Sequence, residues 1–197
     1  YELAPKTHQR KSNTPTMGGL FFLGTALFGI LLCARLDNGY VITAIVCLLG
    51  FGAIGIKDDM AKILGKRNND GLSPRVKFVL QCAMGLIVGA LTLYFTDITT
   101  EFYLPFYKFP VMDLGLFSIV FWMLIMVASS NAVNLTDGLD GLATVPSIFS
   151  MLSLGVFMYL SGNAILSTYL LLPKIMGVGE VVIVASSLIG ALMGFLW

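Results

Sequence analysis

Charged residues are scarce in this sequence, making up 12% of its 197 residues, whereas 57% of the residues are apolar. A soluble domain usually carries about a quarter charged residues, and the mean hydropathy here is +0.87. Water is therefore excluded as the main solvent of the fold. Paired cysteines are also lacking: the three cysteines lie singly inside apolar runs and show no metal-ligand spacing. We interpret them as reduced, packed side chains rather than as a disulfide or a zinc site.

The sequence also lacks an internal inverted repeat of the kind found in many transporters. Its first twelve residues are polar and basic, which is unlike a cleavable secretory signal. The first residue is not Met, and the last residue, Trp197, lies inside an apolar run. We expect one transmembrane domain over residues 1–197, incomplete at both ends.

Six apolar stretches are long enough to cross a bilayer core of about 30 Å, which needs about 17 to 25 residues of helix. They cover residues 17–34, 40–56, 78–95, 114–133, 142–160 and 181–197. A seventh run, 164–172, is too short to span and predicts an interfacial helix or hairpin arm. The sequence therefore predicts an all-α fold, a polytopic transmembrane helix bundle with six spans.

Lys and Arg residues fall unevenly on the two sides of these spans. Nine of the twelve lie before the first span or between the second and third, and three lie on the other side. Because positively charged loops stay in the cytoplasm, the N-terminal segment and the turn at 134–141 are predicted to be cytoplasmic. The loop 96–113, which is rich in aromatic residues, is predicted to rest at the opposite membrane surface.

Three polar clusters lie at cytoplasmic ends of spans, where buried charge is costly unless it is paired or wet. The first, residues 8–19, offers Lys11, Thr14 and Thr16 as possible phosphate ligands, followed by a Gly pair that permits close approach. The alternative interpretation is a positively charged anchor with a helix cap. Residue types and spacing leave both readings open.

The second cluster, residues 55–62, contains the adjacent acids Asp58 and Asp59. Two neighbouring carboxylates repel each other, which favours a divalent cation or basic partners nearby, and Mg²⁺ prefers such oxygen ligands. An ordinary i,i+4 ion pair between Asp58 and Lys62 is the alternative, but it leaves Asp59 unexplained. The basic loop 62–77 that follows attracts either lipid headgroups or a polyphosphate.

The third cluster, residues 129–142, repeats polar side chains at every third position: Asn131, Asn134, Asp137 and Asp140. One straight helix cannot keep all four on one face, because each step of three turns the stripe by about 60°. A helix that opens into a loop at its glycines gathers them in a pocket. The alternative is a loop whose Asn and Asp side chains only cap the next helix.

Three strings in these clusters carry a family resemblance: SNTPTMGG at 12–19, GIKDDMAK at 55–62 and NAVNLTDGLDGLA at 131–143. They resemble the bacterial phospho-N-acetylmuramoyl-pentapeptide translocase (MraY) family, within the superfamily of polyprenyl-phosphate hexose-1-phosphate transferases. The resemblance extends over almost the whole chain. It implies a ten-helix bundle, of which this sequence covers six spans.

The resemblance also implies an activity in peptidoglycan synthesis, and so in cell-wall biogenesis, cell shape and division. UDP-MurNAc-pentapeptide and undecaprenyl phosphate would give lipid I and UMP in a Mg²⁺-dependent transfer at the cytoplasmic face of the bacterial inner membrane. Membrane lipids are the surrounding partners, no nucleic acid is implied, and a homodimer is compatible with the family.

Site residues follow from the same resemblance. Asp58 and Asp59 match the essential aspartate pair, which we predict to be catalytic and to ligate the metal, with a further ligand beyond Trp197. Six matched positions are predicted to bind substrate: Lys11, Thr16, Lys62, Asn134, Asp137 and Asp140.

Three other hypotheses make different predictions. A related transferase would use UDP-N-acetylglucosamine in place of the muramoyl nucleotide. A secondary transporter would carry acids at the middle of the bilayer on discontinuous helices, whereas these acids lie at the ends of spans. A structural scaffold would need no polar clusters on one face.

Overall fold

The computed structural model describes residues 18–65, 71–104, 107–137 and 142–196. The helices of these residues are α1 (Gly18–Cys33), α2 (Gly39–Gly65), α3 (Pro74–Phe95), α4 (Phe117–Thr136), α5 (Thr144–Gly162), α6 (Ala164–Leu170) and α7 (Val181–Leu196), with a 3-10 turn, η2 (Val178–Glu180), before α7. Within this part of the chain, 5 helical segments are long and apolar enough to cross a membrane, and α1 is a shorter apolar helix of 16 residues. The predicted all-α transmembrane bundle is confirmed.

Two helices extend beyond the apolar stretches that predicted them. Helix α2 continues through the second polar cluster to Gly65, and α3 begins at Pro74, where the Ser73 hydroxyl accepts a hydrogen bond from the Val76 N–H as an N-cap. Much of the segment predicted as a basic loop is therefore helical. Hydropathy marks where lipid ends, and a helix can continue past that point into the polar headgroup region.

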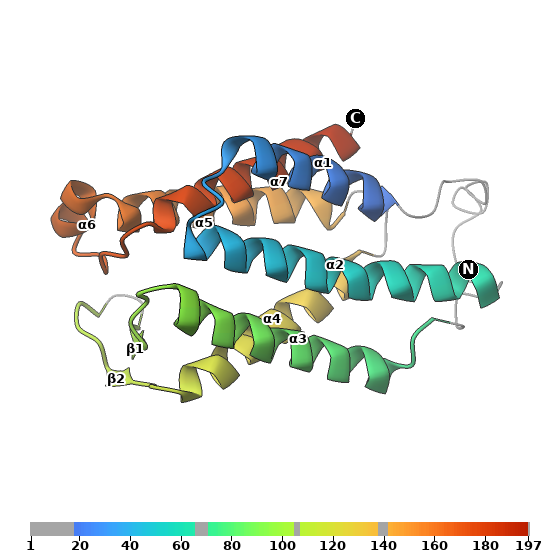
Figure 1. Cartoon of the computed structure of the whole chain (residues 1–197), viewed down its shortest axis with the longest axis horizontal. Helices are drawn as coiled ribbons and strands as arrows, with labels where there is room; N and C mark the ends of the chain where they lie inside the picture. The colour runs from blue at the N-terminus through green and yellow to red at the C-terminus, as the bar shows by residue number, and fades with distance from the viewer. Residues whose placement is uncertain (1–17, 66–70, 105–106, 138–141, 197) are drawn as a thin grey trace.

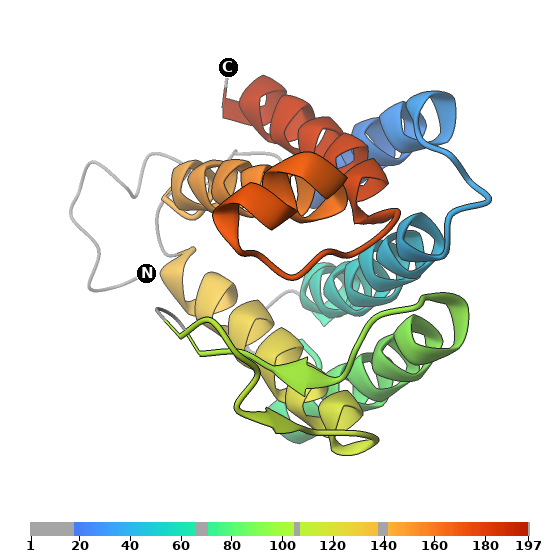
Figure 2. The same ribbon diagram turned by 90° about the vertical axis from the view of Figure 1, so that its left-hand side faces the viewer.

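The helices form two groups that α2 joins. Helices α1, α5 and α7 pack together on one side, α3 and α4 on the other, and α2 contacts α1, α7 and α3 (Figures 1 and 2). A small apolar cluster of Ile30, Val41 and Val184 lies where α1, α2 and α7 meet. Large apolar side chains on the outside, such as Phe28 and Phe149, are more than half exposed, as a lipid-facing surface requires.

Helices α3 and α4 approach closely through two glycines spaced four residues apart on α3. A Cβ built on Gly85 would lie 2.9 Å from Met123 Cγ and 3.2 Å from Met123 Cα, and one on Gly89 would lie 3.3 Å from Ile119 Cα. Small residues at this spacing let two membrane helices pack backbone against backbone, where lipid offers no hydrophobic driving force. The two glycines thus fix the separation of α3 and α4.

Replacing Gly85 with Leu is expected to force α3 and α4 apart. The added side chain meets the backbone of α4, so we expect a loss of about 1–3 kcal/mol in the free energy of unfolding, measured as a lower melting temperature in detergent. Gly24→Leu is the matched control, because a Cβ there has no neighbour within 4 Å among the described residues. Equal melting temperatures for both variants would contradict the close packing.

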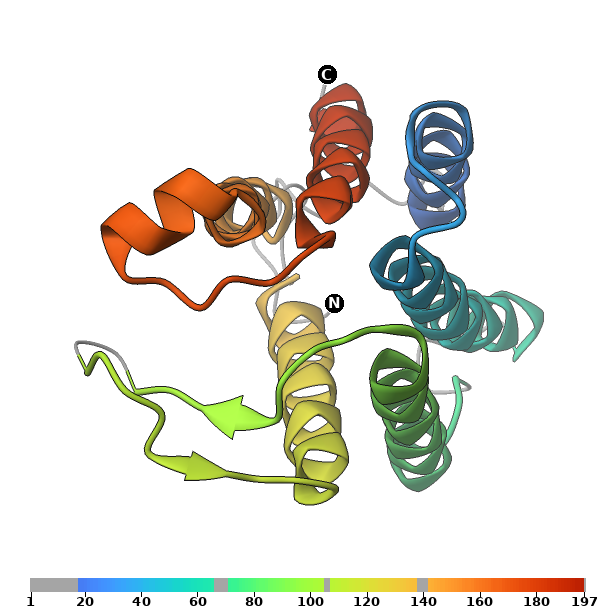
Figure 3. The same ribbon diagram turned by 60° about the vertical axis from the view of Figure 1, so that its left-hand side comes forward.

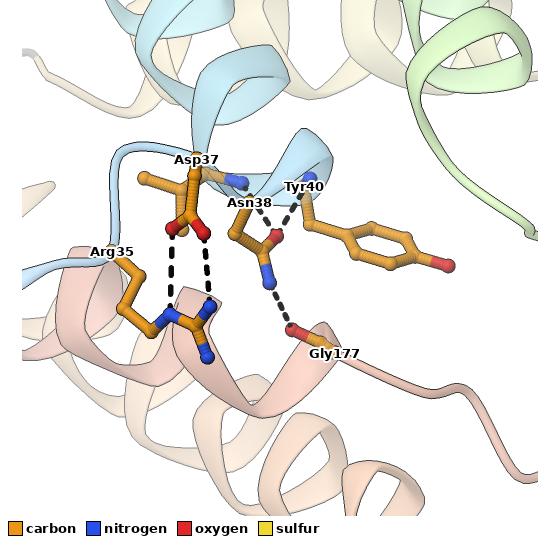
Figure 4. A network of polar contacts seen from close by, with 6 residues as sticks. Arg35, Asp37, Asn38, Tyr40 and Gly177 are labelled. Atoms are coloured by element: carbon orange, nitrogen blue, oxygen red, sulfur yellow. Dashed lines mark hydrogen bonds and ion pairs between the residues drawn. The ribbon is translucent and has the colours of Figure 1, made fainter.

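The end of the bundle with α6 and the strands is fastened by polar contacts (Figure 4). Asn38 accepts hydrogen bonds from the N–H groups of Tyr40 (2.9 Å) and Val41 (3.3 Å), which caps α2, and its own amide donates to the Gly177 carbonyl at 2.9 Å. One side chain therefore joins the α1–α2 turn to the segment before α7. Nearby, the Arg35 guanidinium pairs with Asp37 at 2.9 Å and holds the pKa of that carboxyl below its usual value.

The aromatic loop between α3 and α4 contains a short hairpin that the sequence did not predict. Strands β1 (Glu101–Phe102) and β2 (Met112–Asp113) pair antiparallel, and Phe102 packs edge-on against Phe121 of α4 with ring centroids 5.4 Å apart. For the short run 164–172 we predicted an interfacial helix or a hairpin arm, and the structure has a helix there, α6. Figure 3 shows α6 and the hairpin projecting from the bundle on the same side.

Helices α2 and α4 end, and α1, α3 and α5 begin, toward the other end of the bundle (Figure 1). We call this the polar end. The second polar cluster and the described part of the third lie there, because the helices alternate in direction along the chain.

Candidate functional site

The adjacent acids near the end of α2 face different surroundings. Consecutive residues of an α-helix point about 100° apart, and here Asp58 is buried, at 6% exposed, whereas Asp59 is exposed. The aspartate pair of the sequence is therefore divided into a buried acid and an accessible acid.

Asp58 lies in a polar network that joins three helices. Its Oδ1 accepts a hydrogen bond from the Leu72 N–H at 3.0 Å, and its Oδ2 pairs with Lys77 Nζ at 3.4 Å. The same Nζ donates to Asn134 Oδ1 of α4 at 3.4 Å. A buried carboxylate is tolerated only when charge and hydrogen bonds compensate it, and the Lys77 ammonium supplies both.

A cavity of about 1340 Å³ adjoins this network. Asp59 from α2 and Asp137 from the end of α4 both line it, although 78 positions separate them in the sequence. Its other walls come from α1, α5 and α7 and combine hydroxyl groups with apolar side chains. The cavity therefore has two acids at the polar end, and hydroxyl and apolar side chains form the rest of its walls.

Helix α4 ends where the glycine-rich turn predicted an opening. Thr136 is its last residue, and Asp137 has a non-helical backbone, with φ −77° and ψ 49°, while its N–H still donates to the Val133 carbonyl at 3.1 Å. The carboxylate of Asp137 thus follows the last turn directly. The remainder of the turn, residues 138–141, lies outside the described residues.

The structure describes the side chains of four of the eight predicted site residues, and it brings those four together. Asp58 and Asn134 share the Lys77 ammonium, and Asp59 and Asp137 share the cavity. Lys62 lies on α2, but its side chain is outside the described part. Three further predicted residues, Lys11, Thr16 and Asp140, also lie outside it.

Lys77 has a larger role than the sequence indicated. It was predicted only as one cation of a basic loop, yet it lies in the first turns of α3 and contacts both Asp58 and Asn134. Its i,i+4 neighbour Gln81, a polar residue inside an apolar run, was the available signal that this face of α3 is polar.

Four hydroxyl residues that line the cavity were also missed: Thr25, Thr144, Ser147 and Ser187. Ser and Thr are common in membrane helices because they bond to their own backbone, as Ser147 Oγ does to the Ala143 carbonyl at 2.7 Å. In the sequence they look like ordinary residues of a span. Only the packing of α1, α5 and α7 reveals that they share one cavity.

The oxygen atoms of the cavity suit a hard divalent cation. Among the described residues no group of three or more His, Cys, Asp or Glu side chains gathers at one point. Mg²⁺, however, is usually held by one or two carboxylates together with substrate phosphates and water, and Asp59 and Asp137 offer two carboxylates to one cavity. The two carboxylates are therefore of the chemical type that would hold a magnesium ion together with a phosphate.

Comparison with known proteins identifies a family for most of the chain. The family description "Glycosyl transferase family 4" matches residues 41–197, and "Phospho-N-acetylmuramoyl-pentapeptide-transferase signature 1" matches residues 11–23. Proteins called phospho-N-acetylmuramoyl-pentapeptide-transferase are 64% identical in Campylobacter curvus, 59% in Campylobacter lari and 51% in Nitratiruptor, each over the full chain. The chain spans 56% of the length of these relatives.

The signature overlaps the first polar cluster at residues 11–19, and the family match includes the second and third clusters. The family match therefore covers most of the chain, including the long membrane helices. These include α2 and α4, whose acids line one cavity. The chain belongs to glycosyl transferase family 4, and its residues 11–23 carry the signature of the phospho-N-acetylmuramoyl-pentapeptide transferases.

Proposed function

We propose that the whole protein transfers phospho-MurNAc-pentapeptide from UDP-MurNAc-pentapeptide to undecaprenyl phosphate, forming lipid I and releasing UMP. The reaction takes place at the cytoplasmic face of the bacterial inner membrane and serves peptidoglycan synthesis, and through it cell shape and division. The observation that carries this proposal is that Asp59 and Asp137 line one cavity at the polar end, toward which nine of twelve Lys and Arg residues are predicted to lie.

The chemistry explains why acids and bases are needed together. An oxygen of the lipid phosphate attacks the phosphorus that carries the sugar, a new P–O bond forms, and the bond from that phosphorus to the UMP oxygen breaks. The electron pair of the broken bond leaves with UMP. Attacking group and leaving group are both anions, so positioning and electrostatic compensation supply most of the catalysis.

The residues divide these tasks by their position. Asp59, exposed in the cavity, approaches the lipid phosphate or its metal ion, while Asp58 holds Lys77 at the edge of the site. The remaining predicted residues bind the nucleotide sugar. They are Lys11, Thr16, Lys62, Asn134, Asp137 and Asp140.

Mg²⁺ is the proposed cofactor, and Asp58 and Asp59 are its predicted ligands from this chain. When bound, it compensates the charge of the diphosphate and of the departing UMP. Of the two acids, Asp59 has the more direct access, because it is exposed and lines the cavity, whereas Asp58 is 6% exposed.

UMP formation by the purified whole protein tests both the reaction and its metal. With undecaprenyl phosphate present, we expect UMP from UDP-MurNAc-pentapeptide, a loss of at least about a hundredfold in EDTA, and recovery on adding Mg²⁺. UDP-N-acetylglucosamine in parallel serves as the control nucleotide and should give no UMP.

Each alternative has its own signature in the same assay. Full activity in EDTA would refute the metal requirement, and turnover of UDP-N-acetylglucosamine would assign a different sugar. Uptake of the nucleotide into vesicles with no UMP produced would point to a transporter.

A further inference from the structure

A second polar contact joins α3 to α4 farther from the polar end than Lys77. Gln81 is 2% exposed, its Nε2 donates to Ser130 Oγ at 3.1 Å, and its Oε1 accepts from Asn131 Nδ2 at 2.8 Å. Asn131 Nδ2 also donates to the Val127 carbonyl at 2.8 Å. Both ends of the buried Gln81 amide therefore have partners on α4.

Stability alone is a poor reason for this arrangement. Burying an amide away from water is costly, and hydrogen bonds between membrane helices return on average only about 0.6 kcal/mol each. Met has nearly the same length and would fill the same space without any polar group. The hydrogen bonds of Gln81, unlike apolar packing, depend on direction, and they fix where α4 lies against α3.

The contact stands in register with the site. Gln81 lies four residues, about one helical turn, after Lys77 on α3, and Asn131 lies three residues before Asn134 on α4. The Lys77–Asn134 contact and the Gln81–Asn131 contact are therefore stacked along one helix pair. Gly85, one further turn along α3, supplies close packing, but apolar contact by itself lets a helix slide or rotate.

We propose that Gln81 is a positioning residue of the transferase site. By holding Ser130 and Asn131, it sets the rotation and axial position of α4, and this places Asn134 Oδ1 opposite Lys77 Nζ. The inference rests on the proposed function, since it assigns to Gln81 an effect on the same reaction. It requires that Gln81 act through Asn134, without contact with substrate.

A double-mutant cycle on the purified whole protein tests this dependence. We expect Gln81→Met to lower kcat of UMP formation by about ten- to a hundredfold, the scale that misplacing a reacting group by about an ångström produces, with KM for undecaprenyl phosphate changed less than about twofold. In an Asn134→Ala background the same substitution is expected to have no further effect on kcat. Effects of the two substitutions that multiply would overturn the proposal, as would wild-type kcat for Asn134→Ala.

A matched control separates positioning from a general loss of stability. Ser118 is also buried on α4, at 1% exposed, and donates to the Gly115 carbonyl at 2.7 Å near the opposite end of the helix. Ser118→Ala is expected to lower the melting temperature about as much as Gln81→Met and to leave kcat unchanged. A tenfold loss of kcat in Ser118→Ala would overturn the proposal.

Ser130→Ala gives a milder variant, because it removes one of the two hydrogen bonds and no volume from α3. Ser130→Ala is expected to lower kcat less than Gln81→Met does, and again only when Asn134 is present. An equal loss of kcat in the Asn134→Ala background would overturn the proposal.

Failure of the proposed function is distinguishable from failure of this inference, since the wild-type protein would then release no UMP at all. If only this inference fails, the wild-type protein still releases UMP, and the Gln81 and Asn134 substitutions lower kcat independently of each other.

Discussion

Asp59→Asn is expected to lower kcat of UMP formation by at least about a hundredfold with little change in melting temperature. Asp59 is exposed and lines the cavity with Asp137, so the substitution removes negative charge from the place where metal and phosphates are proposed to meet. Preorganised charge at a reacting phosphate contributes on this scale. Single-turnover measurement of UMP with saturating substrates reports the chemical step.

Asp58→Asn is expected to reduce both activity and stability, which distinguishes the two acids. The new amide N–H₂ would face the Lys77 ammonium in place of a carboxylate oxygen, and an unsatisfied buried group costs about 1–3 kcal/mol. Asp97→Asn, an exposed acid just after α3, is the control for loss of a carboxylate far from the polar end. Equal melting curves for the Asp58 and Asp59 variants would contradict the division into a buried and an accessible acid.

Lys77→Met is expected to give the second largest effect. The substitution removes the ammonium that lies 3.4 Å from Oδ2 of Asp58, a residue that is only 6% exposed. It also removes the hydrogen bond to Asn134. Breaking a buried ion pair costs about 3–5 kcal/mol, and we expect the low end because 20% of the Lys77 side chain is exposed. We further expect kcat/KM to fall about a hundred- to a thousandfold.

Two further variants make this result interpretable. Lys77→Arg keeps the positive charge and is expected to retain stability better than activity, because a planar guanidinium does not reproduce the point contact of an ammonium. Lys108→Met removes a positive charge from the segment between the strands and should change neither property. Wild-type turnover in Lys77→Met would exclude a role for the three-helix network in the reaction.

The membrane spans could be predicted from the sequence because lipid imposes a simple condition. Every backbone amide must be satisfied within the helix, so long apolar runs such as 78–95 correspond to helices, here α3. The ends were less predictable, since α2 continues to Gly65 through polar residues that hydropathy assigns to a loop. The hairpin at β1 and β2 was missed because two-residue strands give no periodic pattern.

Contacts between distant residues were beyond the reach of the sequence. Gln81 and Asn131 are 50 positions apart, and their hydrogen bond exists because Gly85 and Gly89 let α3 approach α4 closely. Lys77 looked like one member of a basic loop until the fold placed it between Asp58 and Asn134. Such relations depend on helix rotation and crossing, which the residue types of one helix do not fix.

By itself the sequence determined that the chain forms a bundle of membrane helices and that the acids of its second and third polar clusters belong to one end, because apolar length and alternating direction leave little choice. Only the tertiary structure decided which acid is buried and which is accessible. Asp58 and Asp59 are neighbours in the chain but point about 100° apart on α2. Helix α3 packs against the side of α2 that carries Asp58 and covers this residue. Asp59 points to another side of α2, where it lines the cavity.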